Sequence, residues 1–440
     1  MEKTFAMISL GCAKNLVNSE QMLYLMSEAG YTLTADPDGA DLAIVNTCGF
    51  IDAAKAEAID NILEMAELKK AGRLQGLIVT GCLAERYKDS ILAEMPEIDA
   101  VLGVSSFKDI VDAADTVMAG SGASLFDDQS APIDEIPRVV TTGPGWAYLR
   151  IAEGCDNYCA FCAIPDIRGR YRSRTMENIL AEAEDLAAHG VKELIVIAQD
   201  ITRYGSDLYG KNSLAELCRR LSAIEGIRWI RLHYLYVDQF DEELIEEIAT
   251  NDKIVKYLDI PIQHINNRIL KRMNRRGTGD DIRALFQTLR QRVPGLVLRT
   301  SLIAGLPGEG EAEFEELCTY LREARLERVG VFPFSPEEGT PAAAMPHVDF
   351  EEAQRRADLI LELQGPIMED FCQRLVGRTL DVLCDSFDEE SGLYVGRCYA
   401  DSPDIDGQVL FTGRCTEGEM VPVLIESTED GILYGTMKGA

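Results

Sequence analysis

The first part of the chain alternates short apolar runs with stretches that have helical spacing of apolar positions. The apolar runs cover residues 5–11, 41–47 and 77–81, and the helical patterns cover residues 19–29, 53–69 and 89–95. A buried strand gives a short continuous apolar run, whereas an amphipathic helix repeats its apolar positions every three or four residues. Strands and helices that alternate in this way predict a βαβ series with a parallel sheet.

The middle of the chain continues this alternation over a longer stretch. Its apolar runs predict six strands, at residues 147–151, 194–199, 228–233, 257–262, 298–304 and 328–334. Helical patterns separate them, at residues 176–189, 213–224, 242–251, 280–292 and 311–324. Repeated βα units of this length predict a partial (βα)6 barrel, with its functional site at the carboxyl ends of the strands.

The last part of the chain changes from helical to strand periodicity. After a helical run at residues 351–371, short β-rich pieces occur at residues 379–384, 393–398, 409–411, 420–425 and 432–436, which predicts a small closed all-β barrel. Residues 119–145 are rich in Gly, Ser, Pro and Asp, as in a surface linker. We therefore expect an N-terminal α/β domain at residues 1–118, a linker at 119–144, a central domain at 145–372 and a terminal barrel at 373–440.

Composition restricts the class of protein. The 440 residues are 46% hydrophobic, 7% aromatic and 27% charged, which is typical of a soluble protein with several domains. No apolar run reaches the ~20 residues that span a bilayer, and the start of the chain does not resemble a signal peptide. We expect a cytoplasmic protein with no membrane partner. In that reducing compartment its 12 cysteines should be free or bound to metal.

The chain is strongly acidic. Its 74 acidic and 43 basic residues give a formal charge of -31, which opposes binding to a polyanion and favours a basic partner. Solubility alone would explain the charge equally well. Residues 376–440 contain 13 acidic and 4 basic residues, a net charge of -9. The terminal barrel should therefore repel a phosphate backbone, so direct binding of tRNA is not expected.

Three cysteines with metal-ligand spacing follow the first strand predicted in the central domain. They belong to the segment Gly154-Cys155-Asp156-Asn157-Tyr158-Cys159-Ala160-Phe161-Cys162, here called the cysteine loop. Three thiolates on one tight loop leave one iron of a four-iron cluster without a protein ligand, and that iron can bind a chelating amino acid. The alternative is that the three side chains only pack as small hydrophobes. Metal binding is the stronger interpretation in a reducing compartment.

Three further cysteines, Cys12, Cys48 and Cys82, each follow one of the predicted N-terminal strands, and are here called the strand-end cysteines. The carboxyl ends of parallel strands meet at one edge of an open sheet, where ligand sites form. These thiols should therefore converge, which predicts a second iron–sulfur cluster with three protein ligands and one open iron. A single cysteine at a strand end more often serves packing, so this interpretation depends on the repetition.

Other polar candidates lie at the carboxyl ends of the central strands. They are Gln199, Asp200, His233, Gln263, His264 and a turn at residues 304–308 that contains Gly305. A glycine-rich turn lets a ligand approach the backbone closely, although most such turns only reverse the chain. The histidines could act as general bases, but a hydrogen-bonded packing role is commoner. We assign no catalytic residue beyond the candidate cluster ligands.

Six motifs together resemble the radical S-adenosylmethionine (SAM) methylthiotransferases over nearly the whole chain. They are Ser9-Leu10-Gly11-Cys12-Ala13-Lys14-Asn15, Asn46-Thr47-Cys48-Gly49-Phe50-Ile51, Ile151 through Pro165, Ile197-Ala198-Gln199-Asp200, Leu258 through His264, and Phe334 through Thr340. The Gly-Cys-Ala-Lys-Asn and Gly-Phe-Ile runs favour the RimO branch, which modifies a small-subunit ribosomal protein, over relatives that modify tRNA adenosines. Ala13 is a small departure, because a proline is common there.

The resemblance implies two 4Fe-4S clusters and SAM as cofactors. A cluster on Cys155, Cys159 and Cys162 would cleave SAM to methionine and a 5'-deoxyadenosyl radical, and a cluster on the strand-end cysteines would carry the sulfur to be transferred. One SAM methylates that sulfur, and a second supplies the radical that removes hydrogen from the β-carbon of an aspartate in ribosomal protein S-twelve. A reducing electron donor such as flavodoxin or ferredoxin is also implied.

The resemblance also suggests residues that contact SAM and the protein partner. The candidates for SAM are Phe161, Gln199, Gln263, Arg275 and Gly305. Two basic clusters could neutralise the carboxylate of SAM or an acidic target side chain, although solvated surface is the default for most of their members. They are Arg168, Arg170, Arg172 and Arg174, and Lys271, Arg272, Arg275 and Arg276. The terminal barrel would be a TRAM domain, whose acidity suits a cationic ribosomal protein.

Two other functions remain open from sequence. A tRNA adenosine (2-methylthio) methylthiotransferase would need the same clusters, but it should have a basic terminal barrel. A non-catalytic iron–sulfur electron-transfer protein would need fully ligated clusters, whereas each candidate site here offers three thiolates.

Overall fold

The structure, a computed structural model, describes residues 3–439 and contains two compact units. The first consists of Met1–Thr141, Ala152–Ser173 and Ser335–Ala343, and the second of Thr142–Ile151, Arg174–Phe334 and Ala344–Ala440. The cysteine loop therefore belongs to the same unit as the strand-end cysteines. No helix within residues 3–439 is long and apolar enough to cross a membrane.

The first unit is built on a six-stranded parallel sheet in the order β2-β1-β3-β4-β5-β6. Its strands are β1 (Lys3–Ser9), β2 (Tyr31–Leu33), β3 (Leu42–Thr47), β4 (Gly76–Gly81), β5 (Ala100–Leu102) and β6 (Ala123–Leu125). All side chains of β3 and β4 are buried, which explains their continuous apolar runs. The three predicted strands are thus confirmed, and β6 lies within the range expected to be a linker.

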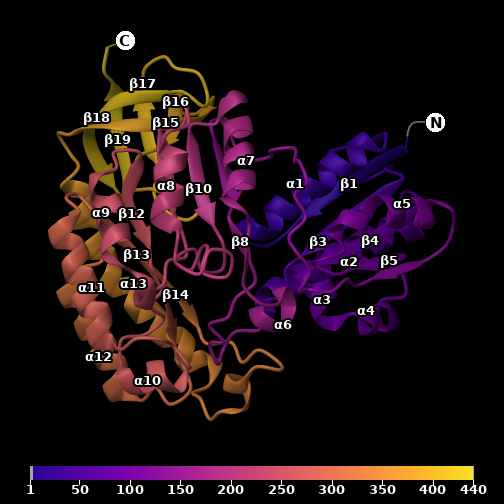
Figure 1. The fold of residues 1–440 in the computed structure, drawn as a ribbon, viewed down its shortest axis with the longest axis horizontal. Helices are drawn as coiled ribbons and strands as arrows, with labels where there is room; N and C mark the ends of the chain where they lie inside the picture. Colours follow the sequence, from indigo (N-terminus) through magenta and orange to yellow (C-terminus); the bar gives the residue numbers. More distant parts are fainter. Residues whose placement is uncertain (1–2, 440) are drawn as a thin grey trace. The chain divides into compact units, whose positions relative to one another are not determined.

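Helices cover both faces of this sheet (Figure 1). They are α1 (Ala13–Glu28), α2 (Asp52–Lys70), α3 (Cys82–Tyr87), α4 (Asp89–Glu94) and α5 (Ile110–Met118). Met22 and Met26 of α1 pack with Ile44 on one face. Ile62 of α2 packs with Val45 on the other. The α/β layers predicted for the N-terminal part are therefore present.

The second unit contains a six-stranded parallel sheet in the order β14-β13-β12-β11-β10-β7. The strands are β7 (Trp146–Arg150), β10 (Glu193–Ile197), β11 (Trp229–Leu232), β12 (Ile254–Asp259), β13 (Val297–Ala304) and β14 (Arg328–Pro333). Amphipathic helices connect them: α7 (Met176–Ala188), α8 (Leu214–Ser222), α9 (Glu242–Thr250), α11 (Gly279–Arg292) and α12 (Glu311–Ala324). The predicted partial (βα)6 barrel is confirmed.

The chain then forms α13 (Phe350–Gln373) and a closed five-stranded barrel in the order β15-β16-β17-β19-β18. The strands are β15 (Thr379–Asp388), β16 (Leu393–Arg397), β17 (Val409–Thr412), β18 (Met420–Glu429) and β19 (Ile432–Met437). A parallel pairing of β17 with β19 closes the barrel, while its other pairs are antiparallel. The five short strands predicted from the sequence are confirmed.

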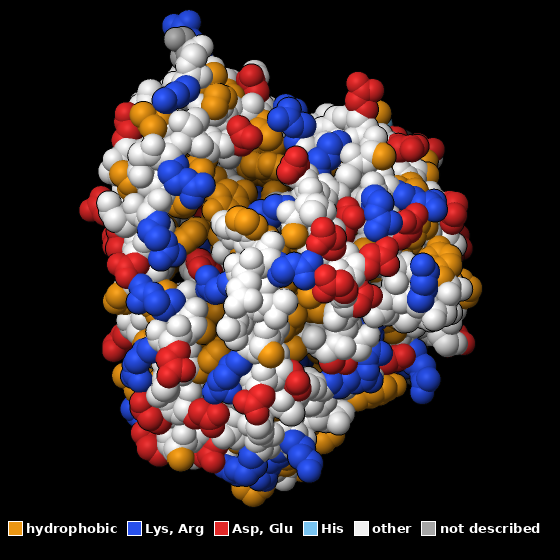
Figure 2. Space-filling model, turned by 60° about the vertical axis from the view of Figure 1, so that its left-hand side comes forward, with side chains coloured by type: hydrophobic (Ala, Val, Ile, Leu, Met, Phe, Trp, Pro, Cys, Tyr) orange, Lys and Arg blue, Asp and Glu red, His pale blue; other side chains and the backbone are white. Residues whose placement is uncertain are grey.

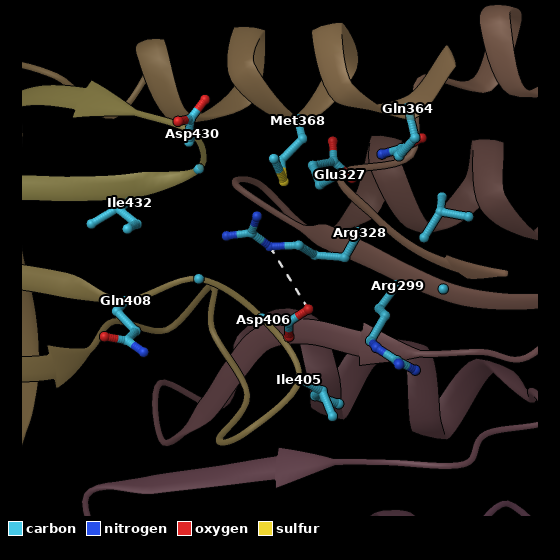
Figure 3. Close-up of a pocket in the computed structure, with 14 residues that line it drawn as sticks. Arg299, Glu327, Arg328, Gln364, Met368, Ile405, Asp406, Gln408, Asp430 and Ile432 are labelled. Atoms are coloured by element: carbon cyan, nitrogen blue, oxygen red, sulfur yellow. Dashed lines mark ion pairs between the residues drawn. The ribbon is translucent and has the colours of Figure 1, made fainter. Parts of the chain in front are cut away.

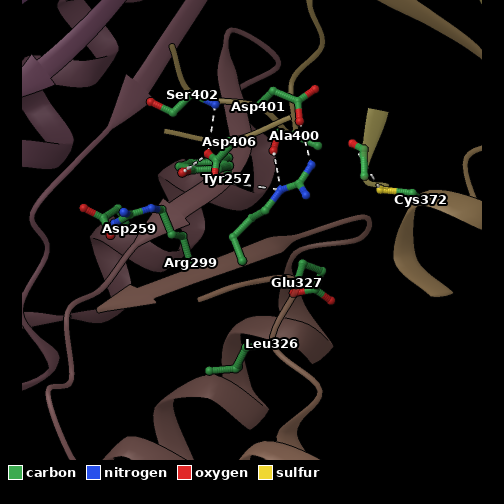
Figure 4. Close-up of polar contacts among 12 residues, drawn as sticks. Tyr257, Asp259, Arg299, Leu326, Glu327, Cys372, Ala400, Asp401, Ser402 and Asp406 are labelled. Carbon is green, nitrogen blue, oxygen red and sulfur yellow. Dashed lines mark hydrogen bonds and ion pairs between the residues drawn. The ribbon is translucent and has the colours of Figure 1, made fainter. Parts of the chain in front are cut away.

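A loop of the terminal barrel, residues 398–408, packs against the partial barrel within the second unit. Arg328 donates a hydrogen bond to Asp401 at 2.6 Å, and the hydroxyl of Tyr257 donates to Asp406 at 2.6 Å (Figure 4). A cavity of about 360 Å3 lies beside this loop, between β14 and α13 (Figure 3). Arg299 and Arg328, which line it, lie near the amino ends of their strands. The cavity is therefore not at the carboxyl edge, where sites form in such barrels.

A buried ionic triad joins the same two parts. Glu193 of β10 accepts hydrogen bonds at 2.7 Å from both Arg231 and Arg397, and all three side chains are buried. Burial alone would raise the pKa of Glu193, but Arg397 and Arg231 together hold the pKa below its ordinary value. The triad should therefore stabilise the fold above the ordinary carboxyl pKa, and this stabilisation should be lost as the pH falls.

We expect Glu193→Gln to lower the free energy of unfolding of the second unit by ~3–5 kcal/mol at neutral pH, because it leaves the buried guanidinium of Arg231 without its carboxylate partner and that of Arg397 with Asp385 alone. The measurement is the urea or thermal midpoint of unfolding, followed by circular dichroism. Glu225→Gln, at an exposed carboxyl, is the matched control. Equal midpoints for the two variants would show that the triad does not stabilise the unit.

Candidate functional site

The strand-end cysteines converge at the carboxyl edge of the first sheet. Cys12 precedes α1, Cys48 directly follows β3, and Cys82 begins α3 directly after β4. Because β1, β3 and β4 are adjacent parallel strands, their ends lie side by side. Gly11 has φ of +92°, and a Cβ atom built on it would lie 2.8 Å from the Cβ of Cys48. Only glycine therefore fits beside Cys48 at this strand end.

Two buried asparagines hold these strand ends together. The side-chain amide of Asn15 donates to the carbonyl groups of Leu10 at 2.6 Å and Thr47 at 3.2 Å. The side-chain amide of Asn46 donates to the carbonyl of Asn15 at 2.9 Å and to the hydroxyl of Ser19 at 2.8 Å. In the sequence both asparagines stand out only as parts of motifs. A polar residue in an otherwise apolar strand, as at Asn46, is the signal that could have identified one of them.

The electrostatics of the three thiols differ. Burial raises the pKa of Cys48 to about 11, with smaller contributions from Cys82 and Cys12, and burial also raises the pKa of Cys82. Desolvation would raise the pKa of Cys12 too, but the charges of Lys14 and Arg168 bring it below its ordinary value. Cys12 thus raises the pKa of both other thiols, and Cys82 raises that of Cys48, as expected of side chains that surround one site. Deprotonation of all three would require cationic charge at that site.

Arg168 supplies a cation beside these thiols. Its side chain is only 2% exposed, so the solvated position that is the default for arginine is wrong here. Nη2 donates to Sγ of Cys82 at 3.4 Å and to Oδ1 of Asn15 at 3.3 Å. Nη1 donates to Oε2 of Glu153 at 3.0 Å. Sequence reasoning could not find the contact with Cys82, because the two residues are 86 positions apart.

The cysteine loop is held as a tight turn in the first unit. It lies between β8 (Ala152–Glu153) and α6 (Ile164–Arg168), and β8 pairs with β9 (Arg172–Ser173). Gly154 has φ of +77°, and a Cβ atom there would lie 2.1 Å from a backbone oxygen of residue 170. The loop therefore needs glycine before its first cysteine.

Backbone hydrogen bonds hold the cysteines of this loop in place. The N–H of Cys155 donates to the carbonyl of Gly169 at 3.1 Å, and that of Cys162 donates to the carbonyl of Cys159 at 3.0 Å. The side chains of Cys155 and Cys159 are buried, whereas Cys162 is half-buried. Three thiols are thus presented from one short segment, as a cluster with one open iron requires.

The second unit gathers other candidates at the carboxyl edge of its sheet. Gln199 lies just beyond β10, Gln263 just beyond β12, and Gly305 directly follows β13. Gln263 has φ of +70°, and its backbone bonds to that of Ser301 at 2.9 Å and Ile303 at 3.0 Å. The structure thus brings the two glutamines to one edge, as the sequence predicts. Phe161 lies in the cysteine loop of the first unit and is half-buried.

Gly305 and Arg275 also make contacts within the second unit. The N–H of Gly305 donates to both carboxylate oxygens of Glu309, at 3.0 and 3.1 Å. A Cβ atom on Gly305 would lie 2.6 Å from that of Ala353, so packing alone requires glycine here. Arg275 donates to the carbonyl of Pro261, and its guanidinium lies 4.5 Å from the ring centre of Tyr236.

Three family models match this chain, and each covers one of its regions. The uncharacterized protein family UPF0004 matches residues 4–103, the radical SAM superfamily matches residues 149–321, and the TRAM domain matches residues 376–437. These matches correspond to the N-terminal sheet, the partial barrel and the terminal closed barrel.

Curated relatives match the chain from end to end. A protein of Caldanaerobacter subterraneus subsp. tengcongensis named ribosomal protein uS12 methylthiotransferase RimO is 50% identical over 98% of this chain and 99% of its own length. A protein of Acetivibrio thermocellus with the same name is 47% identical over 99% of this chain and 98% of its own length. The chain belongs to the RimO family of methylthiotransferases. It is therefore a radical SAM enzyme that uses SAM and iron–sulfur chemistry.

A solved structure supports the fold of this RimO family member. The radical SAM methyltransferase TsrM from Kitasatospora setae, solved with tryptophan substrate and a SAM analogue, aligns with a TM-score of 0.57. The alignment covers 88% of this chain and 79% of TsrM, at 13% sequence identity. At that identity the likeness concerns the fold alone.

The two cysteine sets fit iron–sulfur clusters better than single metal ions. Among residues 3–439, no three His, Cys, Asp or Glu side chains are arranged as ligands of one ion. In a four-iron cluster each thiolate binds a different iron, so its ligands are spaced more widely than those of one ion. Each set supplies three thiols, which matches this requirement.

The two candidate histidines of this RimO family member have structural partners. His264 accepts a hydrogen bond at Nδ1 from the N–H of Asn266 at 3.0 Å, and its Nε2 lies 3.4 Å from Glu309. Nε2 of His233 lies 3.1 Å from the hydroxyl of Ser402 in the terminal barrel. Both imidazoles are buried, so the packing role is the better description of each.

The remaining basic residues differ in exposure, and Arg172 and Arg275 are half-buried while Arg170 is exposed. Arg174 is buried and donates to Glu182 at 2.5 Å and to the carbonyl of Arg150 at 2.7 Å, which corrects the default expectation of a solvated side chain. Three members of the second cluster are exposed as expected: Lys271, Arg272 and Arg276. Asp200 is buried and accepts from the N–H of Thr202 at 3.1 Å.

Proposed function

We propose that this enzyme attaches a methylthio group to the β-carbon of an aspartate in ribosomal protein uS12. The observation that carries the proposal is the presence, in one compact unit, of two sets of three cysteines, one converging from three strand ends and one on a tight loop. The names of the relatives, each a uS12 methylthiotransferase, support the substrate. The test is the mass of uS12 from cells with and without this enzyme.

We assign separate roles to the two sets. Cys155, Cys159 and Cys162 would hold one 4Fe-4S cluster, and the strand-end cysteines would hold a second. When bound, these clusters and SAM would supply the radical that removes hydrogen from the aspartate and the methylthio group that replaces it. The protein holds the thiols at fixed positions through the tight turn at Gly154 and the amide contacts of Asn15.

The candidates for contact with SAM are those expected from the sequence, taken for each unit by itself. We retain Gln199, Gln263, Arg275, Gly305 and Phe161 as these candidates. Gln199 and Gln263 carry amide groups that can bond to the polar groups of SAM. Gly305 would act through its backbone, although packing against Ala353 already accounts for its lack of a side chain.

Domain boundaries, location and redox partner are further parts of the proposal. The matched regions support an N-terminal domain within residues 1–118, a central domain within 145–372 and a terminal domain within 373–440.

A cytoplasmic location suits an enzyme that modifies a ribosomal protein. Reductive cleavage of SAM requires an electron donor, for which a flavodoxin or ferredoxin is suitable.

The terminal barrel offers acidic side chains for docking a basic protein. Asp381, Asp388, Glu389 and Glu390 are exposed on or beside β15. Asp385 differs, because it is half-buried and accepts from Arg397 at 2.9 and 3.1 Å, so it belongs to the internal packing. Figure 2 shows acidic and basic side chains interspersed on the face that it presents. We therefore propose the exposed acidic residues on and beside β15 as the docking surface.

Replacing Asp381, Glu389 and Glu390 by Lys is expected to slow association with uS12 by roughly tenfold at low ionic strength, because long-range charge acts mainly on encounter. SAM cleavage should change little, since these residues are on the terminal barrel. The measurement is association rate against ionic strength by stopped flow, with tRNA as a competitor.

The matched control reverses three exposed acidic residues outside the barrel, Glu184, Glu225 and Glu323. It makes the same change in net charge, so it separates local docking from overall charge. Unchanged association of the barrel variant with uS12, or tight binding of tRNA by the wild type, would favour a tRNA substrate instead.

A further inference from the structure

One buried guanidinium links the two cysteine-bearing segments of the first unit. Arg168 is the last residue of α6, six positions after the cysteine loop, and it reaches Cys82 at the start of α3. Cys82 also packs with Ala163 and Ile167 in one small apolar cluster. The segment that follows one cysteine set thus forms part of the wall around the other.

The partners of Arg168 fix its direction. The carboxylate of Glu153 accepts from Nη1 at 3.0 Å, and the amide oxygen of Asn15 accepts from Nη2 at 3.3 Å. The amide nitrogen of Asn15 in turn donates to the carbonyls of Leu10 and Thr47, beside Cys12 and Cys48. The guanidinium is therefore held from two sides, with Nη2 directed at the sulfur of Cys82 at 3.4 Å.

A cation in this position acts on a metal cluster in a defined way. Hydrogen bonds to ligating sulfur and positive charge nearby favour the reduced cluster, which carries one more negative charge. The effect is strong when the group is buried, because water does not screen it. Arginine suits this role since its guanidinium stays charged when buried.

We propose that Arg168 is a positioning residue that orients Cys82 and raises the reduction potential of the cluster held by the strand-end cysteines. The proposal rests on the proposed function, because it assumes a cluster at Cys12, Cys48 and Cys82. Glu153 should lower the reduction potential of this cluster, because the carboxylate of Glu153 partly neutralises the guanidinium of Arg168. Removing the arginine and removing the glutamate should thus shift the potential in opposite directions.

The test is a potentiometric titration of the reconstituted full-length protein, followed by electron paramagnetic resonance. All variants carry Cys155→Ala, Cys159→Ala and Cys162→Ala, so that only the N-terminal cluster contributes to the signal. Arg168→Gln should lower the reduction potential of the cluster. At a fixed applied potential, the ratio of reduced to oxidised cluster should change by about tenfold toward the oxidised form, which corresponds to about 59 mV for a one-electron couple. The reduction potential of Arg168→Lys should stay close to that of the protein with arginine, and Glu153→Gln should shift the equilibrium toward the reduced cluster.

Controls separate this effect from structural damage and from failure of the proposed function. Arg172→Gln removes a guanidinium four residues away, whose hydrogen bonds go to the backbone carbonyls of Gln129, Arg170 and Arg168 and not to a sulfur, and it should leave the reduction potential unchanged. If Arg168→Gln assembles no cluster, Glu153→Gln is compared with the protein that keeps both Arg168 and Glu153, and equal reduction potentials for these two overturn the proposal. Equal reduction potentials for Arg168→Gln and for the background protein that keeps Arg168 would also overturn the proposal. Absence of iron from the background protein itself would instead contradict the proposed function.

Discussion

Replacing Cys155, Cys159 and Cys162 by Ala is expected to abolish SAM cleavage and to lower iron from about eight to about four atoms per chain. The reason is that all protein ligands of one cluster come from the cysteine loop, which the turn at Gly154 holds in shape. The measurements are iron content after anaerobic reconstitution and the amounts of methionine and 5'-deoxyadenosine formed from SAM under reducing conditions.

A matched control removes three other cysteines, Cys218, Cys318 and Cys372, which are buried in α8, α12 and α13. This variant should keep about eight irons and the ability to cleave SAM, since none of these thiols lies at a candidate site. Continued formation of 5'-deoxyadenosine by the loop variant would exclude the cysteine loop as the site of SAM cleavage.

Replacing Cys12, Cys48 and Cys82 by Ala should leave SAM cleavage close to its original rate but reduce methylthio transfer below detection. The reason is that the two sets lie in regions matched by different family models, the strand-end cysteines within residues 4–103 and the cysteine loop within residues 149–321. The measurements are 5'-deoxyadenosine formation and the mass of uS12 after incubation with enzyme, SAM and reductant.

Other results for this variant would change the roles assigned to the two cysteine sets. Loss of SAM cleavage in this variant, with cleavage retained in the variant without Cys155, Cys159 and Cys162, would require the two cysteine sets to exchange roles. Loss of both activities, with iron reduced to zero, would show that the two sites assemble together. A variant with Cys82 alone replaced by Ser would then identify whether the contact with Arg168 is responsible.

Elements with a strong buried pattern could be predicted from the sequence, and shorter ones could not. Every side chain of β3 and β4 is buried, so each strand appears as a continuous apolar run. By contrast β2, β5 and β6 have three residues each, too few for a periodic signal. β6 joins the edge of the sheet by pairing with β5, which its Gly-rich surroundings concealed.

Spacing revealed the cysteines, but tertiary contacts decided the roles of the charged residues. The cysteine loop and the three strand ends were recognisable because parallel topology places such residues together. Burial of Arg168 against Cys82 and of Arg174 against Glu182 depends on contacts that local sequence does not show. Asp385 is one of the 13 acidic residues of the terminal barrel, yet its partner Arg397 is also held by Glu193 in another part of the unit.

The most direct test of the central claim is the intact mass of uS12 purified from cells that lack this gene, after they receive either the wild type or the variant without Cys12, Cys48 and Cys82. The wild type should increase the mass of uS12 by one methylthio group in place of a hydrogen, and fragmentation should locate the increase on the side chain of one aspartate. The variant should restore nothing. An unmodified uS12 in wild-type cells, together with a methylthio group on a tRNA adenosine that depends on the gene, would contradict the account.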